Sequence, residues 1–486
     1  MLRVTSLQFS FGKSEPLFAR VNLEFQAGEF ALVCGPTGSG KSTLLRTLNG
    51  LAPHFTGGQL SGKIEIDSQD VTGWQPHALA GLVGFVNQQP EGAFVTDTVE
   101  EELVYGMEQL GFDPAVMRER VADLAAKLGL DQILNQQLTE LSGGQQQRVA
   151  IAAALSAEHR LERALPSVDS MVIVHGDGSV TKQKPDEAIR EFRLVPPVVE
   201  LSNRLGLAPA ALSTRDQRFA SVAHPRFEPT EIRQPAEYVG QAAISVTGLS
   251  VAYGSKPAVS DVSLKVERGQ VLALMGENGT GKTSLLWAMQ GSLERSAGSV
   301  ETPWGDTRDM TADERLCAAV LVPQKASDLL FLPTVAAELQ DSDRFAKAAE
   351  TTTATLFQSF AGRVDPSIHP RDLSAGQQLA LVLAIQLAKG AGILLLDEPT
   401  RGLDYSAKRA LAAIIAGLRD RGKAVIVATH DIEFAALIAT DVALLNEGRV
   451  VARGMPVEIF GVGGELPSEV SLALKQPGLF ALEQLS

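Results

Sequence analysis

The chain has 486 residues, enough for two to four domains rather than a single core. Its 43 lysines and arginines are outnumbered by 57 aspartates and glutamates, and the net charge of −14 argues against a protein that holds nucleic acid through its phosphates. The two cysteines, Cys34 and Cys317, lie far apart and lack metal-ligand spacing, which argues against a disulfide framework or a zinc site and favours a reducing cytoplasm.

The N-terminal segment, MLRVTSLQFSF, has no basic stretch before an apolar run, so no signal peptide is predicted. The most apolar segment, residues 379–396, is interrupted by a glutamine, a lysine and two glycines, whereas a membrane span needs about 20 mostly apolar residues. We therefore expect that the chain does not itself cross a membrane.

Two glycine-rich segments indicate a tandem duplication. GPTGSGKST occupies residues 35–43 and GENGTGKTS occupies residues 276–284. Two further pairs follow in the same order: VNQQP around Gln88 with LVPQK around Gln324, and LSGGQQ from Leu141 with LSAGQQ from Leu373. Such self-similarity predicts two copies of one fold.

A block of 39 residues in the second half has no counterpart in the first. The spacing between paired positions drifts from 241 at the two loop lysines to 232 at Ser142 and Ser374, then jumps to 271 at His159 and His430. The unmatched residues 390–428 read as strand, acidic loop, helix and strand of a parallel α/β sheet. Opposite them, residues 148–165 could form one uninterrupted helix, and the gap could be native, a recent deletion or an error in the sequence.

The domain limits follow from the repeat. We expect an N-terminal domain over residues 1–215, a linker over residues 216–241, where prolines recur, and a C-terminal domain over residues 242–486.

Each glycine-rich segment fits the phosphate-binding loop pattern G-x-x-x-x-G-K-[ST], follows an apolar run and opens a helix. Backbone N–H groups of such a loop cradle phosphates, Lys41 or Lys282 reaches the β and γ oxygens, and the hydroxyl of Ser42 or Thr283 binds Mg²⁺. The predicted nucleotide-binding residues of the two loops are Gly35, Pro36, Thr37, Gly38, Ser39, Gly40, Lys41, Ser42 and Thr43, and Gly276, Glu277, Asn278, Gly279, Thr280, Gly281, Lys282, Thr283 and Ser284.

The segment ILLLDEP predicts a buried strand that delivers Asp397 and Glu398 to its carboxyl end, where α/β sheets bind ligands. The two carboxylates can divide the work, because Asp397 can hold Mg²⁺ while Glu398 orients or deprotonates the attacking water. A solvated acidic turn is the alternative for an isolated Asp-Glu pair, but the phosphate-binding loop favours the catalytic interpretation.

The order of P-loop, Gln, LSGGQ, LLLDEP, GLD and ATH resembles that of the ATP-binding cassette family, and the resemblance covers nearly the whole chain apart from the linker. In that family, two cassettes close head to tail over two ATP molecules, and each site combines the P-loop of one cassette with the LSGGQ segment of the other. The resemblance therefore implies two P-loop NTPase domains of α/β fold that pair within one chain.

The resemblance implies that the site at the second P-loop is complete. Its further members are Gln324, Asp397, Glu398 and His430, with Ser142, Gly143, Gly144 and Gln145 from the first half. Gln324 would sense the γ-phosphate and Mg²⁺, and His430 would hold the γ-phosphate, although a histidine at a strand end could also belong to a polar turn. Tyr253 and Phe11 match the aromatic residue that stacks on adenine, and either could instead be a core aromatic.

The other site is expected to be degenerate. It would combine Lys41, Ser42, Gln88 and His159 with Ser374, Ala375, Gly376 and Gln377, and it lacks counterparts of the two carboxylates. Ala375 also replaces a glycine where the backbone must approach phosphate. We expect this site to hydrolyse ATP very slowly or not at all. His159 could be a switch histidine or part of a charged helix face.

Residues 83–111, together with AEHRLER and VPPVVELSNRLGL, resemble the ATPases of energy-coupling factor importers. Those ATPase pairs drive a membrane scaffold protein and a small substrate-binding membrane protein to take up vitamins, their precursors or metal ions. The resemblance implies ATP and Mg²⁺ as cofactors and a peripheral location at the cytoplasmic face of the plasma membrane, and the acidic charge balance predicts no nucleic-acid partner. The alternatives are a ribosome-associated or regulatory tandem cassette protein and a non-hydrolysing interaction subunit.

Three glutamates, Glu100, Glu101 and Glu102, stand where a helix is expected to begin. They could stabilise the helix dipole. They could alternatively dock a basic helix of the scaffold protein.

Overall fold

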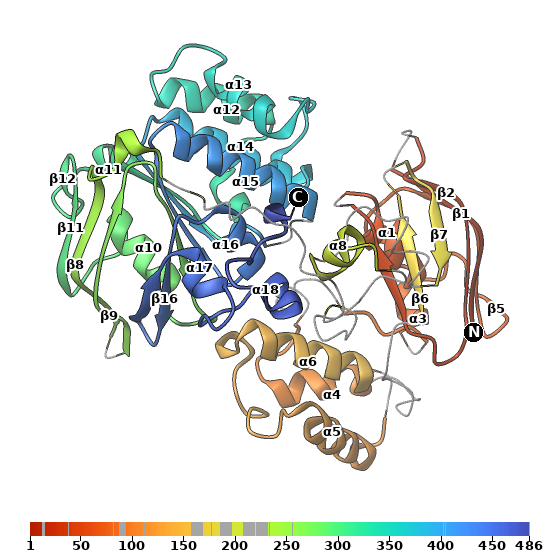
Figure 1. The fold of residues 1–486 in the computed structure, drawn as a ribbon. Coiled ribbons are helices and arrows are strands. Elements are labelled where there is room, and N and C mark those ends of the chain that lie inside the picture. The colour runs from red at the N-terminus through yellow and green to blue at the C-terminus, as the bar shows by residue number, and fades with distance from the viewer. Residues whose placement is uncertain are drawn as a thin grey trace. The chain divides into compact units, whose positions relative to one another are not determined.

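A computed structural model describes most of the chain, namely residues 1–11, 15–36, 38–80, 82–86, 94–109, 112–156, 169–175, 177–184, 197–207, 219, 232, 234–254, 256–401, 403 and 405–485. The chain forms two compact units, Met1–Phe192 and Arg193–Ser486 (Figure 1). Helix α8 (Pro197–Arg204) falls in the second unit, where it packs on α18 (Glu469–Leu474). The first unit is therefore shorter than the N-terminal domain expected over residues 1–215.

The first unit contains two sheets and a group of helices. An antiparallel sheet has the order β2-β1-β4-β5, formed by β1 (Leu2–Ser10), β2 (Phe18–Phe25), β4 (Gln59–Ile66) and β5 (Gln69–Asp70). The other sheet has the order β3-β6-β7, formed by β3 (Ala31–Cys34), β6 (Ser170–Val174) and β7 (Val180–Gln183), and β3 runs parallel to β6. The helices are α1 (Lys41–Leu48), α2 (Leu51–His54), α3 (Pro76–Leu79), α4 (Val99–Gln109), α5 (Pro114–Leu128) and α6 (Gly143–Ser156), with a 3-10 turn at Leu138–Glu140.

Two separate cores support the first unit. Leu7 and Phe9 of β1 point into one core, where they meet Leu44 of α1 and Val172 of β6. The other core lies among α4, α5 and α6 and contains Leu103, Met107, Val121 and Val149. The P-loop helix α1 thus belongs to the sheet core, and the LSGGQ helix α6 belongs to the helical core.

The second unit is built around a six-stranded sheet. Its order is β13-β14-β15-β10-β16-β17, formed by β10 (Val271–Met275), β13 (Ala319–Val322), β14 (Ile393–Asp397), β15 (Ala424–Thr429), β16 (Asp441–Asn446) and β17 (Arg449–Gly454). All neighbours are parallel except β16 and β17. An antiparallel sheet with the order β12-β11-β8-β9 consists of β8 (Ala242–Tyr253), β9 (Lys256–Glu267), β11 (Ala297–Thr302) and β12 (Gly305–Asp306).

Helices cover the parallel sheet of this unit. They are α10 (Lys282–Gln290), α11 (Ala312–Ala318), α12 (Val335–Phe345), α13 (Thr352–Ala361), α14 (Ala375–Ala388), α15 (Tyr405–Asp420), α16 (Ile432–Ile438) and α17 (Pro456–Phe460), with 3-10 turns at Ala236–Tyr238, Ala326–Leu329, Pro370–Asp372 and Leu482–Gln484. Successive residues of β14 enter opposite cores: Leu395 packs in the core that contains α10, and Leu396 in the core that contains α14 and α15. Burial on both faces explains why these strands are apolar throughout.

The fold-class prediction is confirmed: the chain carries two P-loop α/β cassettes, and the described residues of the first contain no strand-helix-strand unit like that of β14, α15 and β15. In the second unit β10 lies between β15 and β16, whereas within the described residues of the first unit β3 pairs with β6 alone. Leu32 of β3 is 42% exposed, while its counterpart Ala273 is fully buried. Of the helix expected over residues 148–165, the part after Ser156 lies outside the described residues.

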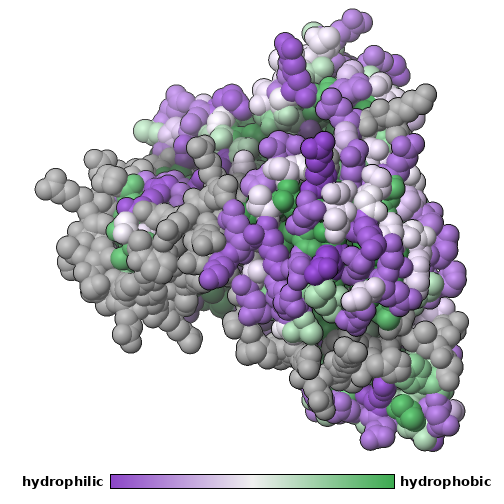
Figure 2. Space-filling view, turned by 90° about the vertical axis from the view of Figure 1, so that its right-hand side faces the viewer, coloured by the Kyte–Doolittle hydropathy of each residue, from purple (hydrophilic) through white to green (hydrophobic). Residues whose placement is uncertain are grey.

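Within the described residues, no helix is long and apolar enough to span a bilayer. On the face drawn in Figure 2, hydrophilic residues predominate, and hydrophobic residues lie scattered between them. Hydrophobic residues exposed singly in this way are normal on protein surfaces.

Candidate active site

The second P-loop joins β10 to α10 and closes around a lysine. Gly279 and Gly281 have φ angles of 84° and 99°, and a Cβ on Gly281 would lie 2.2 Å from the Ala258 carbonyl oxygen, so only glycine fits there. The Nζ of Lys282 donates to the carbonyl oxygens of Gly276 at 2.7 Å and Glu277 at 2.9 Å. The ammonium group therefore lies within the loop, at the N-terminus of α10, where anions bind readily.

A buried carboxylate faces this loop from the end of β14. Thr283 Oγ1 donates to Asp397 Oδ2 at 2.8 Å, and Asp397 is only 2% exposed. Its Oδ1 accepts no hydrogen bond from the described residues. Burial raises the pKa of the Asp397 carboxyl, and the Thr283 hydrogen bond opposes this only in part. A buried oxygen without a partner, beside a threonine hydroxyl, fits a hard divalent cation such as Mg²⁺.

Glu398 is held between a lysine and a histidine. Its φ of 47° is unusual for a non-glycine residue, and its N–H donates to the Ala428 carbonyl oxygen at 2.8 Å. The buried carboxylate places Oε2 2.8 Å from His430 Nδ1 and Oε1 3.4 Å from Lys282 Nζ. His430 follows β15, the neighbour of β14, so parallel pairing brings both residues to one edge of the sheet. A carboxylate fixed in this way can accept a proton from water.

Two other predicted residues lie at the margin of this arrangement. Gln324 follows β13, whose Val322 pairs with Leu396, so it stands at the same edge, but it is exposed and makes no hydrogen bond to the described site residues. Tyr253 ends β8 with an exposed ring, and its Oη lies 3.2 Å from Ser284 Oγ on α10. The tyrosine ring is thus available beside the P-loop.

Both signature segments begin helices in the same way. Ser142 N–H donates to Gln145 Oε1 at 2.9 Å before α6, and Ser374 N–H donates to Gln377 Oε1 at 3.1 Å before α14. The first-turn residues Gly143 and Gly144 are exposed, whereas Ala375 and Gly376 are partly buried. The first turn of α6 is therefore more exposed than that of α14, and pairing of the Ser142 segment with the P-loop of the other unit stays a prediction.

The described residues of the first P-loop have backbone angles and lysine contacts like those of the second. Gly38 and Gly40 have φ angles of 84° and 98°, and Lys41 Nζ donates to the carbonyl oxygens of Gly35 at 2.9 Å and Pro36 at 2.7 Å. Phe11 is exposed, and its ring meets Phe9 edge to face, with 5.0 Å between the ring centroids. Three predicted members of this site, namely Thr37, Gln88 and His159, lie outside the described residues.

Sequence reasoning missed two charged residues beside the site. Asp431 directly follows His430 and accepts from Phe434 N–H as the cap of α16, which an aspartate before an apolar run could have indicated. Lys408 of α15 pairs with Asp431 across 23 residues of sequence, and no local pattern predicts such a contact.

The chain is similar to known proteins over the segments that carry these motifs. The ABC transporter family model matches residues 18–162 and 259–401. An ABC transporter ATP-binding protein of Streptomyces coelicolor is 38% identical over 535 aligned residues, which cover 94% of each chain. Because that alignment is longer than the 486 residues here, part of the relative has no counterpart in this chain.

Two further similarities are more distant. The HMP/thiamine import ATP-binding protein YkoD of Bacillus subtilis is 27% identical over 98% of this chain and 95% of its own length. The solved structure of CbiO1 from Clostridium perfringens, described as part of the ABC transporter complex CbiONQ, is 25% identical and covers 45% of this chain and 91% of that protein, with a TM-score of 0.41.

Proposed function

Because the chain belongs to the ABC transporter family, we propose that it energises an importer of the energy-coupling factor class for a vitamin, a vitamin precursor or a metal ion. Its cassettes are ABC transporter ATP-binding domains, which are ATPases. Support for the importer class comes from residues 83–111 and from the similarity to a protein named for HMP/thiamine import.

The arrangement of Lys282, Thr283, Asp397, Glu398 and His430 is the observation that carries the proposal. Lys282 lies where the β- and γ-phosphates bind in loops of this kind. Thr283 Oγ1 and the free Oδ1 of Asp397 are the oxygens that fit Mg²⁺, which when bound would offset the negative charge of the phosphates.

Glu398 is the group proposed to accept the proton of the attacking water. His430 Nδ1 lies 2.8 Å from Oε2 and Lys282 Nζ lies 3.4 Å from the buried Oε1, so the carboxylate that would accept the proton is fixed between these two groups. His430 would also donate to the γ-phosphate, and Gln324 would approach it from the end of β13. Tyr253 would stack on the adenine.

We infer that only this site hydrolyses ATP. Ser142, Gly143 and Gly144 would complete it from the first unit, while the first P-loop would bind ATP without turnover because no carboxylate-bearing strand lies beside β3 in the described residues. The two cassettes would close on each other as ATP binds. This closure would act on a membrane scaffold protein and a small substrate-binding membrane protein. The chain would bind them at the cytoplasmic face of the plasma membrane.

Steady-state ATP turnover of the full chain tests the site. Glu398→Gln should lower turnover at least about 100-fold, because general-base catalysis contributes about 100- to 10,000-fold. The matched control is Glu294→Gln, which neutralises an exposed glutamate of the same unit and should leave turnover unchanged. Absence of turnover in the unmodified chain, with and without membrane partners, would instead favour a non-hydrolysing interaction subunit.

Purification from membranes tests the importer assignment. The chain should co-purify with two integral membrane proteins, one of them small. Recovery with ribosomal particles instead would contradict the importer assignment and leave the ATPase site intact.

A further inference from the structure

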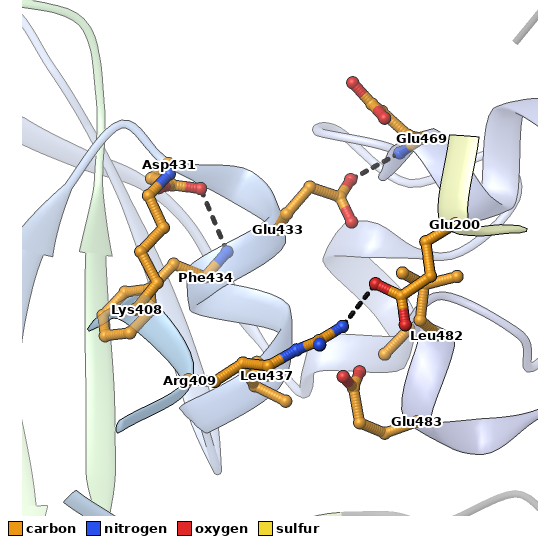
Figure 3. Close-up of a pocket in the computed structure, with 11 residues that line it drawn as sticks. Glu200, Lys408, Arg409, Asp431, Glu433, Phe434, Leu437, Glu469, Leu482 and Glu483 are labelled. Atoms are coloured by element: carbon orange, nitrogen blue, oxygen red, sulfur yellow. Dashed lines mark hydrogen bonds and ion pairs between the residues drawn. The ribbon is translucent and has the colours of Figure 1, made fainter. Parts of the chain in front are cut away.

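Two charged residues outside the proposed catalytic set join α15 to α16 (Figure 3). The Nζ of Lys408 lies 2.6 Å from Asp431 Oδ2, and the two side chains are 25% and 15% exposed. In Figure 3 the Lys408 side chain extends toward Asp431 at the start of α16. An ion pair with this degree of burial holds its geometry better than one on the open surface.

Asp431 connects the end of β15 to the beginning of α16. Its N–H donates to Thr429 Oγ1 at 3.1 Å, and its Oδ1 accepts from Phe434 N–H at 3.0 Å, the bond dashed in Figure 3. The second carboxylate oxygen accepts from Lys408. Both oxygens are therefore engaged, and the carboxylate cannot rotate without breaking the cap or the ion pair.

His430 lies between Thr429 and Asp431 in the chain, and these two neighbours are joined by a hydrogen bond. Its side chain is 63% exposed, so little packing restrains the ring, and its Nδ1 lies 2.8 Å from Glu398 Oε2. The position of the imidazole must then depend mainly on the backbone between Thr429 and Asp431. A displacement of about 1 Å in a catalytic group can lower turnover by about 100-fold.

We propose that Lys408 is a positioning residue for His430. By holding Asp431 in place as the cap of α16, Lys408 fixes the backbone that presents the imidazole to Glu398. The inference rests on the proposed function of this site, since it assigns Lys408 to the same reaction. Lys408 acts through Asp431 and is not itself a catalytic residue.

The adjacent residue provides a matched control. Arg409, on the same helix, forms an ion pair with Glu200 of α8, and Figure 3 shows it directed toward that helix. Arg409→Met therefore removes one cation and one ion pair from α15 without touching Asp431. Lys408→Met removes the same kind of interaction next to the cap, and Lys408→Arg restores the charge.

Turnover and nucleotide binding of the full chain separate positioning from folding. Lys408→Met should lower kcat about 10- to 100-fold while KM and the affinity for a fluorescent ATP analogue change less than about twofold. Lys408→Arg should recover most of the activity, and Arg409→Met should match the unmodified chain. Unchanged kcat in Lys408→Met would overturn the inference. A loss of nucleotide affinity and of the thermal midpoint together with the loss of kcat would overturn it as well, because such a pattern indicates a structural role.

A measurement without turnover distinguishes failure of this inference from failure of the proposed function. Selective ¹³C-histidine labelling, with the His430 signal assigned by His430→Gln, reports the ring position directly. The signal should move in Lys408→Met and stay in Arg409→Met even if the chain hydrolyses no ATP. An unmoved signal in Lys408→Met would refute the positioning role whatever the turnover.

Discussion

A partly buried glutamate on α16, Glu433, should make the stability of the second unit depend on pH. Glu433 borders a cavity of about 210 Å³ and points toward α18, where Glu469 N–H donates to its Oε1 at 2.6 Å (Figure 3). Burial, and to a smaller extent the neighbouring acidic residues Glu469, Asp431 and Glu483, raise the pKa of its carboxyl from 4.5 to about 7, although the hydrogen bond from Glu469 N–H opposes the shift. The cations that line the cavity, Lys408 and Arg409, are paired with other carboxylates.

The sign of the effect follows from the direction of this shift. The folded protein keeps the Glu433 proton up to about pH 7, whereas the unfolded chain loses it near pH 4.5, so stability falls as the pH rises between these values. A pKa difference of about 2.5 units corresponds to about 3 kcal/mol at pH 8 and to less than about 1 kcal/mol at pH 5. Glu433→Gln removes this penalty and keeps an oxygen for the Glu469 N–H.

Urea unfolding of the full chain at pH 5 and pH 8 measures the difference. With Trp74→Phe, the two remaining tryptophans, Trp287 and Trp304, both report on the second unit. Glu433→Gln should be more stable than its parent by about 3 kcal/mol at pH 8 and by less than about 1 kcal/mol at pH 5. Glu483→Gln, which neutralises an exposed carboxylate, should show only a small part of this gain. Equal stability of Glu433→Gln and its parent at pH 8, or a gain that does not shrink at pH 5, would refute the reasoning.

Three further predictions concern the P-loops. Gly281→Ala should lower nucleotide affinity and the thermal midpoint, because the added Cβ would meet the Ala258 carbonyl oxygen. The control is Gly254→Ala, where an added Cβ meets nothing within 4 Å, and it should lower the free energy of unfolding by only about 1 kcal/mol. Thr283→Val should raise the pKa of Asp397 further and increase the Mg²⁺ concentration needed for half-maximal turnover, because it removes the hydroxyl that donates to the carboxylate. Lys41→Ala should reduce ATP bound per chain from two to one in equilibrium dialysis and leave turnover measurable; abolished turnover would mean that the first P-loop takes part in hydrolysis.

The P-loops and the catalytic strand could be predicted because their signals are local. A glycine pattern with a lysine fixes the loop, and the apolar run before Asp397 and Glu398 indicates a buried strand whose end reaches the site. The Lys408–Asp431 pair and the packing of α8 on α18 could not be predicted, since each joins segments that are separated in sequence and no local pattern marks the contact. The composite site remains a prediction because its parts come from different units.

The three glutamates at the start of α4 illustrate a choice that sequence left open. Glu101 Oε2 accepts from Thr98 N–H at 3.2 Å, and Glu102 Oε2 accepts from Val95 N–H and Thr96 N–H, both at 3.0 Å. Two of the three carboxylates therefore serve the helix start itself, as the spacing of Thr98 and Glu101 in a capping box would require. Glu100 and Glu101 are both exposed and Glu102 is buried, so docking of a basic partner helix would depend on the first two carboxylates.

The strands beside each P-loop show how the first cassette can keep this loop although, within the described residues, no counterpart of β14 lies beside β3. A Cβ on Gly35 would lie 2.3 Å from the Val174 carbonyl oxygen of β6, and a Cβ on Gly276 would lie 2.4 Å from the Leu445 carbonyl oxygen of β16. Each loop thus packs against the strand on one side of the central strand, and that strand is present in both units. Asp397, Glu398 and His430 of the second unit lie at the ends of β14 and β15, on the other side of the central strand β10. Within the described residues of the first unit no strand lies on that side of β3, Leu32 is exposed, and the loop around Lys41 keeps its form, which is why we expect this cassette to bind ATP without hydrolysing it.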